Sequence, residues 1–216
     1  MRAVAKGARR MKSRFGAALE PFTLIRLAFY ERENRELVSI SSAEILRSHF
    51  KLAAQVEASE VLAYMGELVG DFAPPHEPNE KLFRMVTACV EALETSAVPG
   101  RLVLRYFEVW LLRLAGLFPD LRSCAECGAR LDEAQPAYLD VEVNSHCHNC
   151  SHGPAQRLLP ETQRALIATQ HLPPLDFAIK FKDLSEQSDA QVAELTHRLI
   201  VRALDRRPRT LAGSTR

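Results

Sequence analysis

Apolar and polar residues alternate along the first part of the chain. The alternation runs through residues 22–30, and a second apolar run follows at residues 37–40. A period of two residues is typical of β-strands with one buried face. The polar segment 31–36 predicts a turn between these strands, and the short run 2–7 predicts a third strand. The sequence therefore predicts a thin three-stranded sheet, and after Ser42 the pattern becomes helical.

Two amphipathic helices are predicted in the middle of the chain. The apolar residues of segments 61–72 and 82–93 recur at the offsets i, i+1, i+4, i+7, i+8 and i+11, which lie on one face of a helix. The proline pair at 74–75 is expected to end the first helix. Residues 102–118 are apolar on nearly all sides, which predicts a central helix packed by neighbours on several faces, with Trp110 in the core.

Shorter elements are predicted in the last third of the chain. Residues 138–143 alternate strictly and predict a short strand. Residues 160–172 predict a helix that is closed by the proline pair at 173–174. A capping box at 188–191 predicts the start of a last helix, which ends at Pro208. Together these patterns predict an α+β protein in which a small sheet precedes a mainly α-helical region.

Four of the five cysteines form two Cys-x-x-Cys pairs separated by 19 residues. This spacing is typical of a zinc ribbon or knuckle, and four thiolates fill a tetrahedral zinc ion without leaving a position for an activated water. The predicted ligands of this structural Zn²⁺ are Cys124, Cys127, Cys147 and Cys150. The alternatives are four unrelated thiols or a redox pair. The fifth cysteine, Cys89, lies on an apolar helical face and is expected to behave as a small hydrophobic residue.

The residues around the cysteines indicate which side chains bind the metal and what the segment contacts. Three histidines flank the second pair, and one of them could replace a cysteine, but a complete set of four sulfurs favours supporting or exposed roles for His146, His148 and His152. Five carboxylates lie between the outer cysteines against Arg130 alone; they are Glu126, Asp132, Glu133, Asp140 and Glu142. Such a surface repels phosphate. We expect the zinc segment to brace the helices or to contact another protein.

The composition is that of a globular protein, with 47% hydrophobic and 25% charged residues. The formal net charge of +1 conceals a segregation, because residues 1–30 hold seven lysines and arginines against one acidic residue. Residues 198–216 hold six arginines against one acidic residue, and the region between is acidic. The charged residues within 102–118 exclude a membrane span, and no apolar run follows the basic N-terminus. We expect a cytoplasmic protein without membrane contact.

Six basic residues fall within thirteen positions near the N-terminus. Clustered cations suit a phosphate backbone, because each neutralised phosphate releases counterions. The candidate DNA-binding residues are Arg2, Lys6, Arg9, Arg10, Lys12 and Arg14. Phe15 adds a ring of the kind that stacks on single-stranded bases. The alternative is a flexible, solubilising terminus. The arginines at 198–209 are ambiguous, because Arg198 and Arg202 are one helical turn apart and could form a solvated face.

No group of residues in the sequence has the pattern of a catalytic site. There is no nucleophile with a base, no carboxylate pair, no open metal position, no Walker motif and no GxGxxG motif. The sequence therefore predicts a binding protein rather than an enzyme. The alternative from a different class is a zinc-ribbon adaptor or transcription regulator without functional DNA contact. A metalloenzyme is a third class, and it needs an open coordination position.

The order of these parts resembles a known family. The segments AVAKGARRMKSRFGAALEPFT, ISSAEIL and FEVWLLRLAGLFPDLRSCAECG, with the second knuckle CHNC, resemble the RecO family of bacterial DNA repair proteins. The resemblance covers nearly the whole chain. It implies an N-terminal OB fold that carries the six basic residues, followed by an α-helical domain with a four-cysteine zinc site.

The same resemblance implies a function. Members of the family are recombination mediators that bind single- and double-stranded DNA and anneal complementary strands. Together with RecR they help to load RecA onto DNA that is coated with single-strand binding protein. A protein of this kind is expected to be associated with the nucleoid, with DNA, RecR, RecA and single-strand binding protein as partners.

Two departures from the family pattern shape the expected architecture. Members often have glycines where this chain has residues 144–146, so the second knuckle is expected to differ in detail. An OB fold needs five strands, and this sequence has room for about three before Ala43. We therefore expect an incomplete OB fold at 1–45 and a helical domain at 46–216, with a zinc module at 122–153.

The start of the chain carries a related expectation. The short strand at 2–7 has no preceding strand with which to complete a barrel. We therefore expect Met1 to be an internal methionine or a misassigned start, with roughly 25 to 30 upstream codons that encode the two strands missing from a five-stranded OB fold.

Overall fold

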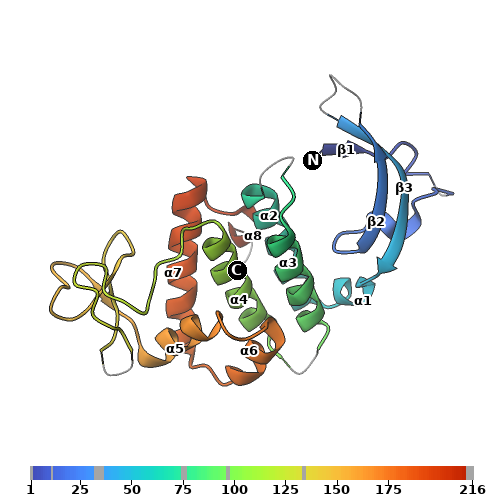
Figure 1. Cartoon of the computed structure of the whole chain (residues 1–216). Coiled ribbons are helices and arrows are strands. Elements are labelled where there is room, and N and C mark those ends of the chain that lie inside the picture. Colours follow the sequence, from blue (N-terminus) through green and yellow to red (C-terminus); the bar gives the residue numbers. More distant parts are fainter. Residues whose placement is uncertain are drawn as a thin grey trace.

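The computed structural model describes residues 2–10, 12–31, 37–73, 77–95, 98–132 and 135–212. In Figure 1 the N-terminal sheet, in blue, lies at one end of the molecule and the helices form its middle. A small module of loops and short strands, in yellow, lies at the other end. The protein is α+β, as the sequence predicts. None of the helices in the described ranges has the length and apolar character that a membrane crossing requires.

Three strands form the N-terminal sheet in the order β1-β3-β2. They are β1 (Arg2–Val4), β2 (Leu24–Tyr30) and β3 (Leu37–Arg47). Strand β3 pairs in parallel with β1 and antiparallel with β2. The turn predicted at 31–36 lies, apart from Glu31, outside the described residues. Within the part of the chain that is described, the sheet is open at both edges and does not close into a barrel.

The strand β3 is longer than its sequence pattern indicates. The pattern predicts a change to helix after Ser42, whereas β3 continues to Arg47 and stays paired with β2. The two serines interrupt the apolar run but do not leave the sheet, because the Ser41 hydroxyl donates a hydrogen bond to the carbonyl of Ala28 on β2 (3.0 Å). The predicted change of period was therefore placed five residues too early.

Three helices of the first half follow the predicted apolar segments; they are α2 (Val56–Phe72), α3 (Glu80–Leu93) and α4 (Gly100–Leu114). The short helix α1 (Phe50–Ala53) was not predicted. Asn79 caps α3, since its side-chain oxygen accepts a hydrogen bond from the amide of Leu82 (3.0 Å). The proline pair predicted to end the helix α2 lies outside the described residues.

Helix α4 ends four residues before the predicted end of its apolar segment. Gly116 takes a positive φ of 72°, and the amide of Leu117 donates a hydrogen bond back to the carbonyl of Leu112 (2.8 Å). This is the pattern of a Schellman cap, which glycine adopts without strain. Apolar composition continues past the helix because Phe118 packs against the core from the following loop.

The helices of the second half are α5 (Pro160–Ala168), α6 (Pro174–Lys180), α7 (Glu186–Leu204) and α8 (Arg209–Ala212). The sequence missed α6, because the proline pair at 173–174 was interpreted only as a helix end. Pro174 is instead the first residue of α6, where its fixed φ and missing N–H are tolerated. The cap of α7 was predicted three residues too late, since Ser185 accepts a hydrogen bond from the amide of Ser188 (3.3 Å).

Helix α4 is the centre of the hydrophobic core, as predicted. It contacts α2, α3, α6 and α7, and its Phe107 is fully buried. Trp110 is only partly buried, and its indole N–H donates a hydrogen bond to the carbonyl of Thr169 (2.7 Å). Cys89 on α3 is fully buried beside Met85, so it behaves as the predicted small hydrophobic residue.

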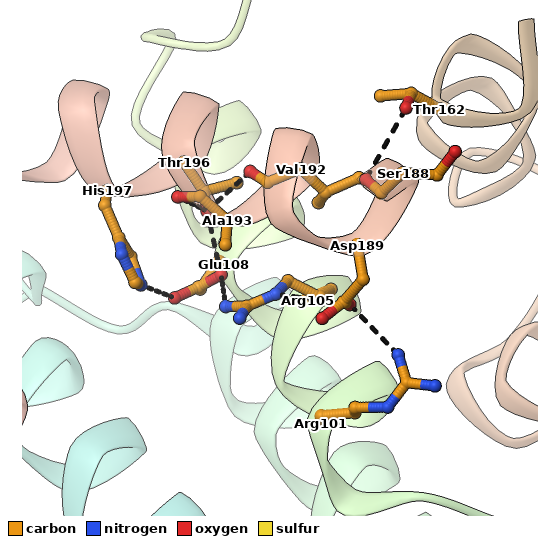
Figure 2. A network of polar contacts seen from close by, with 10 residues as sticks. All are labelled: Arg101, Arg105, Glu108, Thr162, Ser188, Asp189, Val192, Ala193, Thr196 and His197. Atoms are coloured by element: carbon orange, nitrogen blue, oxygen red, sulfur yellow. Dashed lines mark hydrogen bonds and ion pairs between the residues drawn. The ribbon is translucent and has the colours of Figure 1, made fainter. Parts of the chain in front are cut away.

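A buried polar network joins α4 to α7 (Figure 2). The carboxylate of Glu108 is fully buried and accepts hydrogen bonds from Arg105 Nη1 (2.9 Å) and Thr196 Oγ1 (2.8 Å). Its other oxygen lies 3.1 Å from His197 Nε2. Burial raises the pKa of Glu108, but Arg105 and His197 outweigh that effect and hold the pKa below its ordinary value. The carboxylate is therefore ionised within the helical body.

Two contacts attach the sheet to the helices. Phe22, which has a positive φ of 57°, lies against α2 at Gly66, where an added Cβ would be 3.4 Å from its ring. At the end of β3, Arg47 forms ion pairs with Glu91 on α3 and with Glu94, which directly follows that helix. The junction therefore combines an apolar contact with a pair of charged ones.

Candidate metal centre and nucleic-acid interface

The four cysteines lie in a module between α4 and α5. Its strands are β4 (Tyr138–Leu139), β5 (Ser145–His146) and β6 (Gln156–Arg157), and β4 pairs antiparallel with both of the others. This three-stranded sheet brings the second cysteine pair, which follows β5, next to the first pair, which precedes β4.

The strand predicted at 138–143 is only two residues long. Asp140 turns the chain, because its carboxylate accepts hydrogen bonds from the backbone amides of Glu142 (2.9 Å) and Asn144 (2.8 Å). Val143 then takes a positive φ of 70°. The strand prediction was therefore wrong for residues 140–143, which form a tight loop between β4 and β5.

Each cysteine pair is carried by a turn of the backbone. In the first turn the amide of Gly128 donates a hydrogen bond to the carbonyl of Cys124 (2.9 Å), and Gly128 has a φ of 70° that a residue with a Cβ rarely adopts. In the second turn the amide of Cys150 donates to the carbonyl of Cys147 (3.2 Å). The amide after Cys124 also bonds to the carbonyl of Ser145 (2.7 Å), so the two turns are joined directly.

The four sulfur atoms converge on one point. All lie within 4.8 Å of one another, and the Sγ atoms of Cys127 and Cys147 are 3.8 Å apart. A tetrahedral zinc ion with Zn–S bonds of about 2.3 Å sets its sulfurs about 3.8 Å apart. All four cysteines are free thiols, and within the described ranges they form the one cluster of potential ligands of this kind. The residues therefore fit a four-thiolate metal centre.

The electrostatics of the cluster favour a bound cation. Burial raises the pKa of the Cys124 thiol, but hydrogen bonds from the backbone of Cys127, Cys147 and Glu126 outweigh it and bring the pKa to about 6. Hydrogen bonding to Cys127 and Cys147 raises the pKa of Cys150 far above its ordinary value. One sulfur is thus readily ionised while another resists ionisation, and a metal ion reverses that resistance because it stabilises every thiolate.

The flanking histidines lie outside this set of ligands. His146 has its Nε2 3.0 Å from the carboxylate of Asp140, which raises the pKa of the imidazole. The ring of His148 lies against Tyr138, with 5.6 Å between the ring centres. The backbone of His152 bonds to the carbonyl of Cys150. His146 and His148 therefore have contacts that support the loop around the cysteines.

The module is fastened to the helices rather than free. Gln163 on α5 accepts a hydrogen bond from the amide of Ala137 (3.1 Å) and donates one to the carbonyl of Leu121 (3.4 Å). Gln191 on α7 donates to the carbonyl of Arg157 (2.9 Å). Apolar residues of the module join the core of the helical body; they are Leu121, Leu131, Ala137, Leu139, Val143 and Leu158. This arrangement agrees with a module that braces the helices.

The basic residues of the N-terminal segment lie beside the sheet. The residues between β1 and β2 form successive turns, beginning with hydrogen bonds from Ala8 to Ala5 and from Arg10 to Gly7. All six candidate DNA-binding side chains are exposed; they are Arg2, Lys6, Arg9, Arg10, Lys12 and Arg14. None of the six forms an ion pair with a carboxylate in the described ranges; Arg14 alone donates a side-chain hydrogen bond there, and its acceptor is a backbone carbonyl. We call these six residues the basic arm.

Arg14 and Phe15 hold the basic arm to the sheet. The Phe15 ring is buried, and the Arg14 guanidinium lies 4.9 Å from its centre while donating a hydrogen bond to the carbonyl of Ile40 (3.4 Å). The expectation that Phe15 stacks on DNA bases was therefore wrong, because the ring is covered. Its role is to anchor the turn that presents the neighbouring cations.

Two of the arginines near the C-terminus, Arg202 and Arg206, contact other parts of the fold. Arg202 donates a hydrogen bond to the carbonyl of Glu142 in the module (3.3 Å). Arg206 forms ion pairs with Glu67 (3.0 Å) and Asp71 (2.5 Å) on α2. Two nitrogens of Arg198 are buried. The sequence left the role of these cations ambiguous. Arg202 and Arg206 contact other parts of the fold, whereas the two buried nitrogens of Arg198 have no hydrogen-bond partner among the described residues.

Comparisons with known proteins match nearly the whole chain to one family. Residues 1–49 match the model of the recombination protein O N-terminal region, and residues 54–212 match the model of its C-terminal region.

Individual relatives agree with the family models. The DNA repair protein RecO of Koribacter versatilis is 37% identical over 135 residues, which are 62% of this chain and 54% of that protein. RecO of Anaeromyxobacter sp. strain K is 35% identical over 170 residues, which are 79% of this chain and 66% of that protein. The chain thus spans about half to two thirds of the length of these relatives. From the two family models and these identities, the chain belongs to the RecO family of DNA repair proteins.

Proposed function

We propose that this protein is a recombination mediator that binds single- and double-stranded DNA through its basic arm without reading the base sequence. The observation that carries the proposal is the exposure of six cations on β1 and the turns that follow it, none of them with a carboxylate partner among the described residues. Unpaired, exposed cations gain most from phosphate contact, because no protein ion pair has to be broken and counterions are released.

The steps that follow DNA binding rest on the family. We propose that the protein anneals complementary strands and, together with RecR, helps to load RecA onto DNA coated with single-strand binding protein. Its membership in a family of DNA repair proteins supports this proposal. A protein with this role acts at the nucleoid, and it binds and positions strands without making or breaking covalent bonds.

We also propose that the four cysteines hold a structural Zn²⁺ ion. The convergence of their sulfurs supports it, and the ion would stabilise four thiolates without an open coordination position. For the division of the chain we propose an OB-fold part followed by a helical domain; the boundary expected at residue 45 falls inside β3, so it is placed after Arg47. The zinc module expected at 122–153 extends through β6 to Arg157, is inserted in the helical domain and is held by α5 and α7.

A strand-annealing assay tests the proposed function. Two complementary labelled oligonucleotides are mixed with the protein, and the rate at which they pair is followed by fluorescence. We expect the protein to accelerate pairing and the triple variant R9A/R10A/K12A to lose most of that acceleration, because three phosphate contacts are removed. The matched control is K81A/R84A/K182A, which removes three exposed cations from the helical body.

If R9A/R10A/K12A accelerates pairing as much as the control variant and the unmodified protein do, the DNA surface lies elsewhere. No acceleration by the unmodified protein, together with no DNA binding, would favour the zinc-ribbon adaptor. The observation that supports the adaptor is the acidic surface of the cysteine module, in which Glu126 and Glu142 are exposed. Its function would then lie in protein contacts alone.

A further inference from the structure

A groove runs between helices α2 and α3 at the point where the end of β2 approaches them. Its volume is about 580 Å³. Six apolar residues line it; they are Phe29 from β2, Val69 from α2, Ala73 directly after α2, and Leu82, Phe83 and Val86 from α3. We call this feature the groove. It is separate from both the basic arm and the cysteine cluster.

The groove exposes apolar surface that no residue in the described ranges covers. Phe83 is 56% exposed and Phe29 is 42% exposed, although both lie next to buried or half-buried residues of the helical core. Large aromatic side chains are seldom left this open beside a concave apolar surface unless something binds there. On α3 the lining residues are spaced i, i+1 and i+4, and the end of α2 contributes Val69, with Ala73 directly after the helix. The surface therefore presents two helical ridges, between which a third helix could lie.

The charges of the groove define what can occupy it. Glu31 and Glu77 are the charged residues of its lining, which contains no lysine or arginine within the described part of the chain. Neither glutamate forms an ion pair with a described cation, in contrast to Glu67 and Glu91 nearby on the same two helices. Two unpaired carboxylates beside an apolar surface repel phosphate and acidic peptides, and they attract a segment that carries lysine or arginine.

From this geometry we infer that the groove is the docking site of a basic amphipathic helix that belongs to a partner protein. Apolar side chains of the helix, at i, i+4 and i+7, would enter between Phe29, Phe83 and Val69. Its basic residues would lie against Glu31 and Glu77. Because the groove is lined by both the sheet and the helical body, a helix bound there would contact both at once. This inference does not depend on the proposed DNA binding.

Fluorescence anisotropy with two designed peptides tests the inference. Each labelled peptide has about 15 residues and leucine at the same i, i+4 and i+7 positions. One carries lysines on its other faces, and the second carries glutamates in their place. We expect the lysine peptide to bind and the glutamate peptide not to bind. We expect the variant E31K/E77K to bind the lysine peptide about five to ten times more weakly, because two attractive pairs become repulsive.

Matched variants separate the groove from general charge and hydrophobicity. F83A removes an exposed ring from the groove, whereas F50A removes a ring that is 74% exposed on α1, outside the lining. We expect F83A to weaken binding of the lysine peptide and F50A to leave it unchanged. E60K makes one of the same charge changes at an exposed position of α2 outside the groove, and it should have little effect. Circular dichroism and the melting temperature show whether each variant is folded.

Three results would overturn the inference. One is equal affinity for the two peptides, or no binding of the lysine peptide at about millimolar concentration. Another is a DNA affinity that falls in F83A, which would make the groove part of the DNA surface. The last is a concentration-dependent dimer of the unmodified protein that F83A abolishes, because the groove would then be covered by a second copy of this chain.

Discussion

At the scale of single residues, the sequence predicted the chemistry of the cysteines better than that of any other group. The spacing of Cys124, Cys127, Cys147 and Cys150 was sufficient to expect one cluster, and the four sulfurs do converge. The prediction that Phe15 stacks on DNA bases was wrong. The sequence shows that this aromatic residue adjoins a basic one, but it does not show that the ring is buried. Likewise, Arg202 of α7 has a partner far away in the sequence, the backbone carbonyl of Glu142.

The first prediction concerns the cysteines. We expect the protein to contain one zinc ion per chain, and C127S or C150S to lose the ion and several kcal/mol of stability, because metal binding is coupled to folding. Elemental analysis and thermal unfolding with and without chelator measure this. C89S is the control, since it alters a buried thiol outside the cluster and should retain the metal. A protein without zinc, whose unfolding is indifferent to chelator, would contradict the prediction.

The second prediction concerns the buried carboxylate of Glu108. In E108Q the Arg105 guanidinium keeps its charge but loses its ionised partner, so we expect a loss of about 3 to 5 kcal/mol in the free energy of unfolding. Denaturant unfolding measures it. E60Q changes an exposed glutamate on α2 and should cost less than about 0.5 kcal/mol. A loss of the same small size in E108Q would mean that the network contributes little to stability.

At the scale of elements, helical periodicity located α2, α3 and α4 well because each presents a continuous apolar face to the core. The predictions of secondary structure failed where a single residue determines the local backbone conformation. Asp140 converts an alternating segment into a loop, and Pro174 starts a helix that its position after another proline did not suggest. Such choices depend on bonds to particular backbone groups, which a pattern of polarity does not record.

The third prediction concerns the contact between α2 and α8. Burial raises the pKa of Glu67, but hydrogen bonds from the amides of Arg209 and Thr210, with those from Thr210 Oγ1 and Arg206, outweigh it and lower the pKa to about 2. A carboxylate whose pKa falls on folding stabilises the folded state fully above its ordinary pKa, near 4.5, and this contribution disappears as the pH falls toward 2.

Unfolding free energies measured between about pH 7 and pH 2 test this contact. We expect E67Q to be less stable than the unmodified protein at neutral pH, and the difference to shrink in acid as the carboxylate of the unmodified protein becomes protonated. E60Q, on the same helix but exposed, should follow the unmodified curve. A difference between E67Q and the unmodified protein that stays constant with pH would show that Glu67 does not titrate as described.

At the scale of the whole molecule, the chain separates positive and negative surfaces between its parts. The basic arm lies beside the sheet, and the acidic residues are concentrated in the helical body and the cysteine module. The sequence predicted this separation from residue counts alone. It could not predict that Arg47 and Phe22 attach the sheet to α3 and α2, because those contacts join segments about forty residues apart or more.

A titration of the protein with DNA at several salt concentrations tests whether the basic arm binds DNA. We expect the affinity for single-stranded and duplex oligonucleotides to fall linearly with the logarithm of the salt concentration, independently of base sequence. In R9A/R10A/K12A the slope should decrease by about 2 to 3, close to one phosphate per lost cation, and in K81A/R84A/K182A it should not change. Equal slopes for the unmodified protein and both triple variants would contradict the account.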